Sequence, residues 1–235
     1  MTPEELRSSV FACMYCDGRG LPFNRNHSDK FYRFPPIGAP AAANLLFIGI
    51  NPRVSHSNRI LHNSIVEDVV EFRRLSENRV GNADYIGNPG LESHYRLHVS
   101  VVKALFPGSP FASAASLTEL HFCATSNSQG LPYATSLCAD QFLPDVLEIV
   151  SPQVVFAVGA HVERTLRVLF KTGPTEMLSA KWSQTGNAPV FTLPLPTNVA
   201  QRRPDLTRRC RTRKKYLATT VFVKHGVLRK ARRAS

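Results

Sequence analysis

Short, continuous apolar runs alternate along the chain with longer stretches in which apolar residues recur at helical spacing. Residues 45–49, 154–159 and 190–193 are such runs, and residues 117–122 form a fourth candidate. Apolar runs of this length are typical of parallel strands that are buried on both faces. The pattern therefore predicts four strands.

Helical spacing fills most of the chain between these runs. It predicts helices over residues 64–77, 91–106, 135–150 and about 160–170. Pro144 is expected to kink the third helix or to reset its start. Near the N-terminus, Thr2-Pro3 followed by two acidic residues predicts a capped helix that runs to about Cys13.

The alternation of strands and helices predicts a three-layer α/β/α sandwich around a central, mostly parallel four-stranded sheet. Ligands of such sheets bind at the carboxyl ends of the strands. There is no GxxxxGK[ST] phosphate loop and no GxGxxG fingerprint in the sequence. Nucleotide-cofactor functions consequently lose support.

Charge divides the chain into two parts. The net charge is +12, and residues 201–235 hold 13 of the 29 basic residues but only one acidic residue. In the first 200 residues the numbers of basic and acidic side chains are equal. We expect a folded domain over residues 1–200, followed by a basic helix and tail that attracts nucleic-acid phosphates. A merely solubilising tail is the alternative. No apolar run approaches the roughly 20 residues of a membrane span, and the acidic, polar start is unlike a signal peptide.

Four of the five cysteines form two widely separated pairs. Cys13 and Cys16 make a CxxC motif, and Cys123 and Cys138 are separated by fourteen residues. Two pairs of thiolates suit either zinc or an iron–sulfur cluster, whereas scattered cysteines are often small buried apolar residues. The number of cysteines is odd and there is no secretory signal, so we expect reduced thiols in the cytosol and no disulfide framework. Cys210, in the basic tail, is the cysteine left over.

Several motifs, taken in order, resemble the uracil-DNA glycosylase superfamily and its iron–sulfur branch. The run Gly49-Ile50-Asn51-Pro52 is similar to the family's water-activating motif, and Tyr85-Ile86-Gly87 to its aromatic-x-Gly. Residues 118–123 and 137–143 match a strand that ends in a cysteine and a helix that begins with another. The resemblance covers about residues 5–200.

The resemblance implies a monomeric DNA-repair enzyme that hydrolyses the glycosidic bond of uracil in DNA. Asn51 would position the attacking water, and Tyr85 would stack on the flipped base. Gly49, Ile50, Glu119, His121, Pro196 and Thr197 would contact the substrate, and Asn198, Arg202 and Arg203 would contact DNA. Cys13, Cys16, Cys123 and Cys138 would hold a structural 4Fe–4S cluster. Excision requires a base flipped into a pocket and stabilisation of the charge that develops on the departing base.

Two positions depart from the family pattern. Leu195-Pro196-Thr197 stands where most members have His-Pro-Ser, so the histidine that donates to the base is missing. Candidates for the missing donor are His56, His121 and His161, although each is more easily explained as structural. Glu119 stands where iron–sulfur members have asparagine, and an ionised glutamate can only accept hydrogen bonds. It would need to be protonated, or helped by a neighbour such as His121, to read both uracil N3–H and O4.

Two other functions fit the same residues. One is a protein of the glycosylase fold that binds uracil-containing or abasic DNA with little catalysis. The other is a zinc-ribbon-like nucleic-acid module. The Gly-x-Asn-Pro motif favours the enzyme over the first of these.

Overall fold

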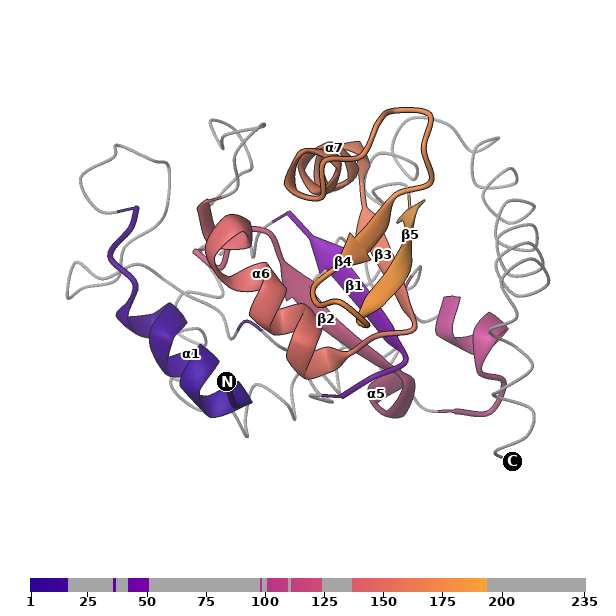
Figure 1. The fold of residues 1–235 in the computed structure, drawn as a ribbon. Helices are drawn as coiled ribbons and strands as arrows, with labels where there is room; N and C mark the ends of the chain where they lie inside the picture. Colours follow the sequence, from indigo (N-terminus) through magenta and orange to yellow (C-terminus); the bar gives the residue numbers. More distant parts are fainter. Residues whose placement is uncertain are drawn as a thin grey trace, which may run out of the picture.

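A five-stranded sheet lies at the centre of the structure, which is a computed structural model (Figure 1). The strands are β1 (Leu45–Gly49), β2 (Ala115–Glu119), β3 (Val154–Val158), β4 (Ser179–Lys181) and β5 (Asn187–Leu193). Their order across the sheet is β2-β1-β3-β5-β4. All neighbours pair in parallel except β4 and β5, which form an antiparallel hairpin. The residues that the structure describes are 1–16, 36, 42–50, 98, 101–109, 111–123 and 137–193.

Helices connect and cover these strands. They are α1 (Pro3–Ala12), α5 (Phe111–Ala114), α6 (Leu137–Val150) and α7 (Ala160–Leu169), and residues 101–105 are helical as well. Figure 1 shows α6 lying across the sheet with α1 beside it. The predicted helix over 64–77 and the basic segment 201–235 lie outside the described residues.

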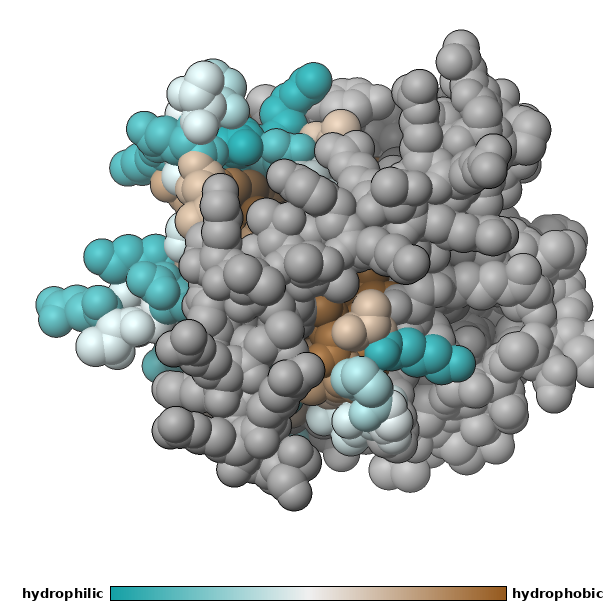
Figure 2. All heavy atoms as spheres, turned by 90° about the vertical axis from the view of Figure 1, so that its right-hand side faces the viewer, coloured by the Kyte–Doolittle hydropathy of each residue, from teal (hydrophilic) through white to brown (hydrophobic). Residues whose placement is uncertain are grey.

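The two faces of the sheet bury separate hydrophobic clusters, because successive side chains of a strand point to opposite faces. On one face, Leu46 and Ile48 pack with apolar residues of α1, α6 and α7. On the other face, Leu45 and Phe47 pack with residues of the 101–105 helical segment. Each fully buried side chain of this size contributes about 1.5–3 kcal/mol. In Figure 2, hydrophilic side chains of the described residues project outward, and hydrophobic ones lie deeper.

The mostly parallel α/β character of the fold was predicted correctly, but the strand count was wrong. Residues 179–181 add a fifth strand that the apolar pattern does not reveal, because Ser-Ala-Lys is short and not apolar. Its position comes from the hairpin with β5, in which Trp182 N–H donates to the carbonyl of Gly186 at 3.1 Å.

The second strand also differs from its prediction. It covers residues 115–119 rather than 117–122, so the strand ends at Glu119 and not at Cys123. Among the described strands its hydrogen-bonded partner is β1, and their register ends with the pair of Gly49 and Glu119.

Helix α6 corrects the expectation for Pro144. The helix begins at Leu137, seven residues before Pro144, and continues through it to Val150. Proline therefore does not reset the start. Among the described helices, none is long and apolar enough to cross a membrane.

Helix α1 begins as predicted, with a complete capping box. The Thr2 hydroxyl accepts from the backbone N–H of Glu5 at 3.1 Å, and the Glu5 carboxylate accepts from the N–H of Thr2 at 2.7 Å. Both bonds satisfy donors that the first helical turn leaves unpaired. Because the helix leads directly to Cys13, its start also supports the position of the first cysteine pair.

We expect Thr2→Ala to lower the free energy of unfolding by about 1 kcal/mol, since one N-terminal donor loses its acceptor. Urea denaturation followed by circular dichroism measures the change. Glu4→Gln is the matched control, because Glu4 is in the same first turn but outside the capping box. Equal stability of Thr2→Ala and the parent protein would contradict the assignment.

Candidate functional site

Two segments that the sequence analysis identified separately lie side by side at the carboxyl edge of the sheet. Gly49, at the end of β1, is the parallel partner of Glu119, at the end of β2. The pairing continues beyond the strands, where Leu120 N–H donates to Gly49 O and His121 N–H donates to Ile50 O, both at 3.0 Å. The segment that begins the Gly-Ile-Asn-Pro motif is thus held against the segment that carries Glu119.

The carboxyl group of Glu119 lies directly against the backbone of Gly49. A Cβ atom added to Gly49 would overlap that carboxyl, so glycine provides the space that it occupies. Glu119 as a whole is partly exposed, but its Oε2 atom is buried and has no hydrogen-bond partner among the described residues. Burial raises the pKa of Glu119 to about 8. At neutral pH the protonated form therefore predominates.

His121 lies two residues farther along the same segment and is fully buried. Burial, with a smaller contribution from His161, lowers the pKa of His121 to about 4, and Cys16 acts in the opposite direction. The imidazole is consequently neutral at pH 7. The side chain has no exposed surface, and its contact with a substrate stays a prediction.

His161 occupies the first turn of α7, directly after β3, and is partly exposed. Burial and the neighbouring Arg164 lower its pKa. Of the three candidates for the missing donor, His161 combines partial exposure with a position at the carboxyl edge of the sheet. His56 lies outside the described residues.

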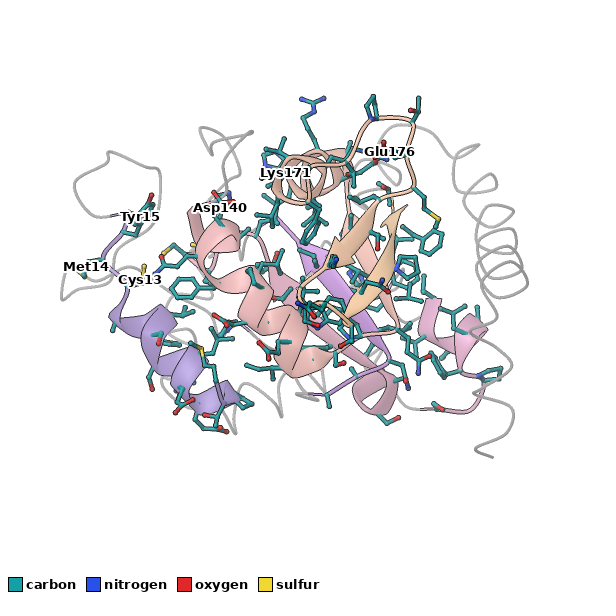
Figure 3. All side chains as sticks on the ribbon, in the orientation of Figure 1. Cys13, Met14, Tyr15, Asp140, Lys171 and Glu176 are labelled. Carbon is teal, nitrogen blue, oxygen red and sulfur yellow. The ribbon has the colours of Figure 1, made fainter. Side chains whose placement is uncertain are left out.

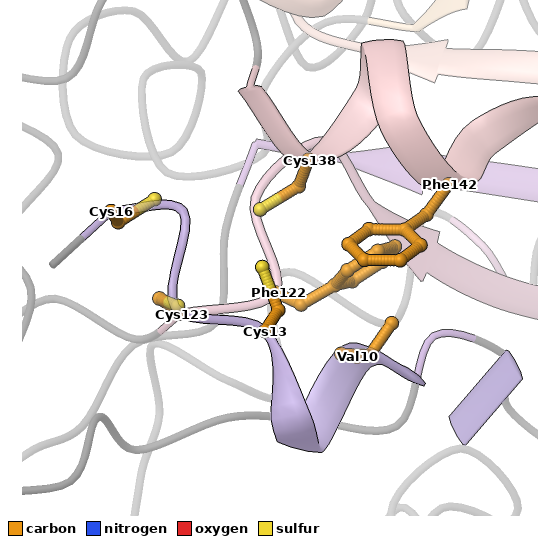
Figure 4. A pocket seen from close by; sticks show the side chains of 7 residues that line it. All are labelled: Val10, Cys13, Cys16, Phe122, Cys123, Cys138 and Phe142. Carbon is orange, nitrogen blue, oxygen red and sulfur yellow. The ribbon is translucent and has the colours of Figure 1, made fainter. Parts of the chain in front are cut away.

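The four paired cysteines lie around one small pocket. Figure 4 shows their side chains gathered around a common space together with Val10, Phe122 and Phe142. Cys13 and Cys16 come from the end of α1 and the turn after it, Cys123 from the segment after β2, and Cys138 from the first turn of α6. The fold thus brings both pairs together from three separate parts of the chain.

None of these four cysteines forms a disulfide, and their thiols lie close together. Cys16, Cys123 and Cys138 are buried, whereas Cys13 is partly exposed. The thiol of Cys138 interacts with those of Cys123 and Cys16, and this contact raises the pKa of Cys138 well above its usual range. Crowded thiols cannot all ionise unless a positive charge compensates them, and a metal centre supplies that charge.

Cys13 forms the open side of this pocket. Its Sγ accepts from the backbone N–H of Tyr15 at 3.5 Å and lies 4.0 Å from Oε1 of Gln141. Figure 3 shows Cys13, Met14 and Tyr15 at the end of α1, on the side of the molecule where Asp140 marks the start of α6. The N–H of Tyr15 is directed at a sulfur, which is the kind of donor that stabilises a bound thiolate.

The donor set fits a four-thiolate centre in its chemistry, because thiolates are ligands of both zinc and iron–sulfur clusters. Within the described ranges, no three His, Cys, Asp or Glu side chains are arranged so that they could hold a metal ion. What the structure provides is one pocket with four sulfur donors, three of them shielded from water.

Three apolar residues of the pocket were not predicted from the sequence. Val10 precedes Cys13 by three residues, Phe142 follows Cys138 by four, and Phe122 is adjacent to Cys123. Residues three and four apart share one side of a helix, so the first two could have been found from spacing alone.

Several predicted site residues lie outside the described part of the chain. They include the residues assigned to water activation and base stacking and those assigned to the final motif and DNA contact: Asn51, Tyr85, Pro196, Thr197, Asn198, Arg202 and Arg203. Of the predicted set, the structure places Gly49, Ile50, Glu119, His121 and the four cysteines.

Comparison of the chain with models of known protein families and with curated protein sequences found no match.

We expect Glu119 to make the free energy of unfolding decrease as pH rises from about 4.5 to about 8. Over this interval the unfolded chain releases the proton that the folded protein retains, so the folded state loses stability relative to it. Glu119→Gln should remove a decrease on the order of 2 kcal/mol, a figure reduced to allow for partial exposure.

Urea titrations at several pH values measure this difference. Glu148→Gln is the control, because it removes one carboxyl from the exposed side of α6. Parallel stability profiles for Glu119→Gln and the parent protein would show that Glu119 does not retain its proton.

Proposed function

We propose that the protein is a DNA glycosylase that hydrolyses the N-glycosidic bond of uracil in DNA, leaving an abasic site. Its fold would be the three-layer sandwich of the uracil-DNA glycosylase superfamily. The observation that carries the proposal is the pairing of Gly49 with Glu119. The motif assigned to water activation and the residue assigned to base reading come from segments seventy residues apart, yet they meet at the carboxyl edge of the sheet, where ligands of such folds bind.

Each part of the reaction has a candidate residue. The target base must leave the stack and enter a pocket. Asn51, two residues after Gly49, would hold the attacking water through its amide, and Tyr85 would stack on the base. Glu119 would read the polar edge of the base. The backbone N–H of the buried His121, which donates to Ile50 O, would hold the two segments together.

Negative charge develops on the departing base, so a donor near it would lower the barrier. Leu195 cannot supply the donor that the family's histidine provides. We propose His161 for this role, because it is partly exposed in the first turn of α7 at the end of β3. Neutral imidazole retains one N–H donor, so the lowered pKa of His161 is compatible with the role.

The four-cysteine pocket is proposed to hold a 4Fe–4S cluster with Cys13, Cys16, Cys123 and Cys138 as ligands. Four thiolates from two separated pairs suit such a cluster, and the same set also suits zinc. The position of the CxxC pair before the Gly-Ile-Asn-Pro motif, which resembles the iron–sulfur branch of the superfamily, favours the cluster. Hydrolysis requires no electron transfer, so the cluster would be structural.

DNA would be the partner of the basic segment 201–235. Its 13 basic residues would add phosphate contacts that do not depend on sequence and that weaken steeply with salt. Asn198, Arg202 and Arg203 would approach the duplex next to the excision pocket.

The second candidate is a protein of the same fold that binds uracil-containing or abasic DNA with little catalysis. The triplet Leu195-Pro196-Thr197 favours it, because it lacks the family's donor at that position.

Release of free uracil from a uracil-containing duplex tests the proposal. We expect release by the parent protein and a decrease of at least about a hundredfold in Asn51→Ala, because the attacking water loses its positioning group. Asn187→Ala is the control, since Asn187 is an exposed asparagine of β5. Tight binding without release would favour the second candidate.

Metal analysis tests the cluster separately. We expect purified protein to contain iron and sulfide and to absorb near about 400 nm. Cys138→Ser should lower the iron content and the free energy of unfolding, since one ligand is lost. Cys210→Ser is the matched control because Cys210 belongs to neither pair. Colourless protein that contains zinc would contradict the cluster.

A further inference from the structure

The carboxyl of Glu119 is a buried polar group that the fold of the described residues does not use. Its Oε2 has no hydrogen-bond partner among them, and it lies at the carboxyl edge of the sheet. An isolated buried carboxylate is costly, so a group in this position binds a ligand or remains protonated.

None of the described elements packed against β2 supplies a compensating positive charge. β1 and α5 contain no titratable side chain, and α6 carries only acids and a thiol: Cys138, Asp140, Asp145 and Glu148. The segment after β2 adds Cys123 and the buried, neutral His121. On the face of the sheet that carries Glu119, Lys103 is exposed to solvent, and His98 is buried with its ring 4.6 Å from that of Phe47. Burial is accordingly the one cause that acts on the pKa of Glu119.

The absence of a side chain at Gly49 provides the space in which the Glu119 carboxyl lies. Because a side chain at this position would overlap both carboxyl oxygens, the group rests on the bare backbone at the end of β1. Asn51 follows two residues later, so the carboxyl and the proposed water-positioning amide come from adjacent ends of paired strands.

We propose that Glu119 reads the base as a neutral carboxylic acid, donating its O–H to uracil O4 and accepting the N3–H of uracil on its other oxygen. This inference rests on the proposed function and names the chemistry of its substrate: a base whose edge presents an N–H beside a carbonyl. The neutral acid offers the same donor and acceptor pair as the amide of asparagine. After ionisation both oxygens only accept, and the carboxylate repels O4.

The rate of uracil release under single-turnover conditions, measured from about pH 6 to about pH 9, tests this inference. The parent rate should fall about tenfold over this range, as expected for a group with a pKa of about 8 that must be protonated. Glu119→Gln, whose amide cannot ionise, should change by less than about twofold. Glu119→Ala should be slow throughout.

The outcomes separate the inference from the proposed function. If the parent protein releases no uracil, the proposed function fails, and the inference fails with it. If it releases uracil at a rate that does not fall between pH 6 and pH 9, only the inference that Glu119 acts as a neutral acid is overturned. A fall of equal size in Glu119→Gln also overturns it, because the titrating group must then lie elsewhere.

Gly49→Ala provides a second variant in case Glu119→Gln does not fold. The added methyl group occupies the position of the carboxyl, so the end of the Glu119 side chain must move while the backbone can stay. We expect weaker binding of uracil-containing DNA, with little change in binding of undamaged duplex. An equal loss for both DNAs, or no loss, would contradict the role of the carboxyl in base reading.

Discussion

The parallel pairing of β1 with β2 is the contact on which the rest of the site depends. It places Gly49 opposite Glu119 and continues through the hydrogen bonds from Leu120 and His121 to the end of β1. The same five-residue segment, 119–123, then leads to Cys123 in the cysteine pocket. A change in this register would therefore displace the carboxyl and one thiol together.

Three titratable side chains of this region share a second feature: each is buried without a compensating charge. The Glu119 carboxyl, the His121 imidazole and the Cys138 thiol all have pKa values shifted toward the neutral form. Water is excluded from each of them, and among the described residues no basic side chain replaces it for the carboxyl. A metal centre would reverse this balance for the thiols, because it stabilises the thiolate form. A base that offers both a donor and an acceptor would satisfy the carboxyl without ionising it.

Part of the fold could be predicted because the apolar runs are unambiguous. Residues 45–49 and 154–158 are continuous apolar stretches, and Thr2-Pro3 carries a complete set of capping signals. Residues 179–181 could not be predicted, since their strand exists through pairing with β5 rather than through composition. The end of β2 was misplaced for the same reason: the apolar pattern continues to Phe122, but the partner strand ends earlier.

The candidate site divides in the same way. Residue type and spacing identified the two cysteine pairs, because thiols at short spacing are recognisable metal ligands in the sequence alone. Glu119 and the Gly-Ile-Asn-Pro run were identified through the resemblance to the uracil-DNA glycosylase superfamily. Only the tertiary structure decided that all four thiols share one pocket and that the Glu119 carboxyl rests against Gly49. It also decided that this carboxyl is buried and neutral. Burial depends on neighbours that are distant in the sequence, and therefore no local pattern contains it.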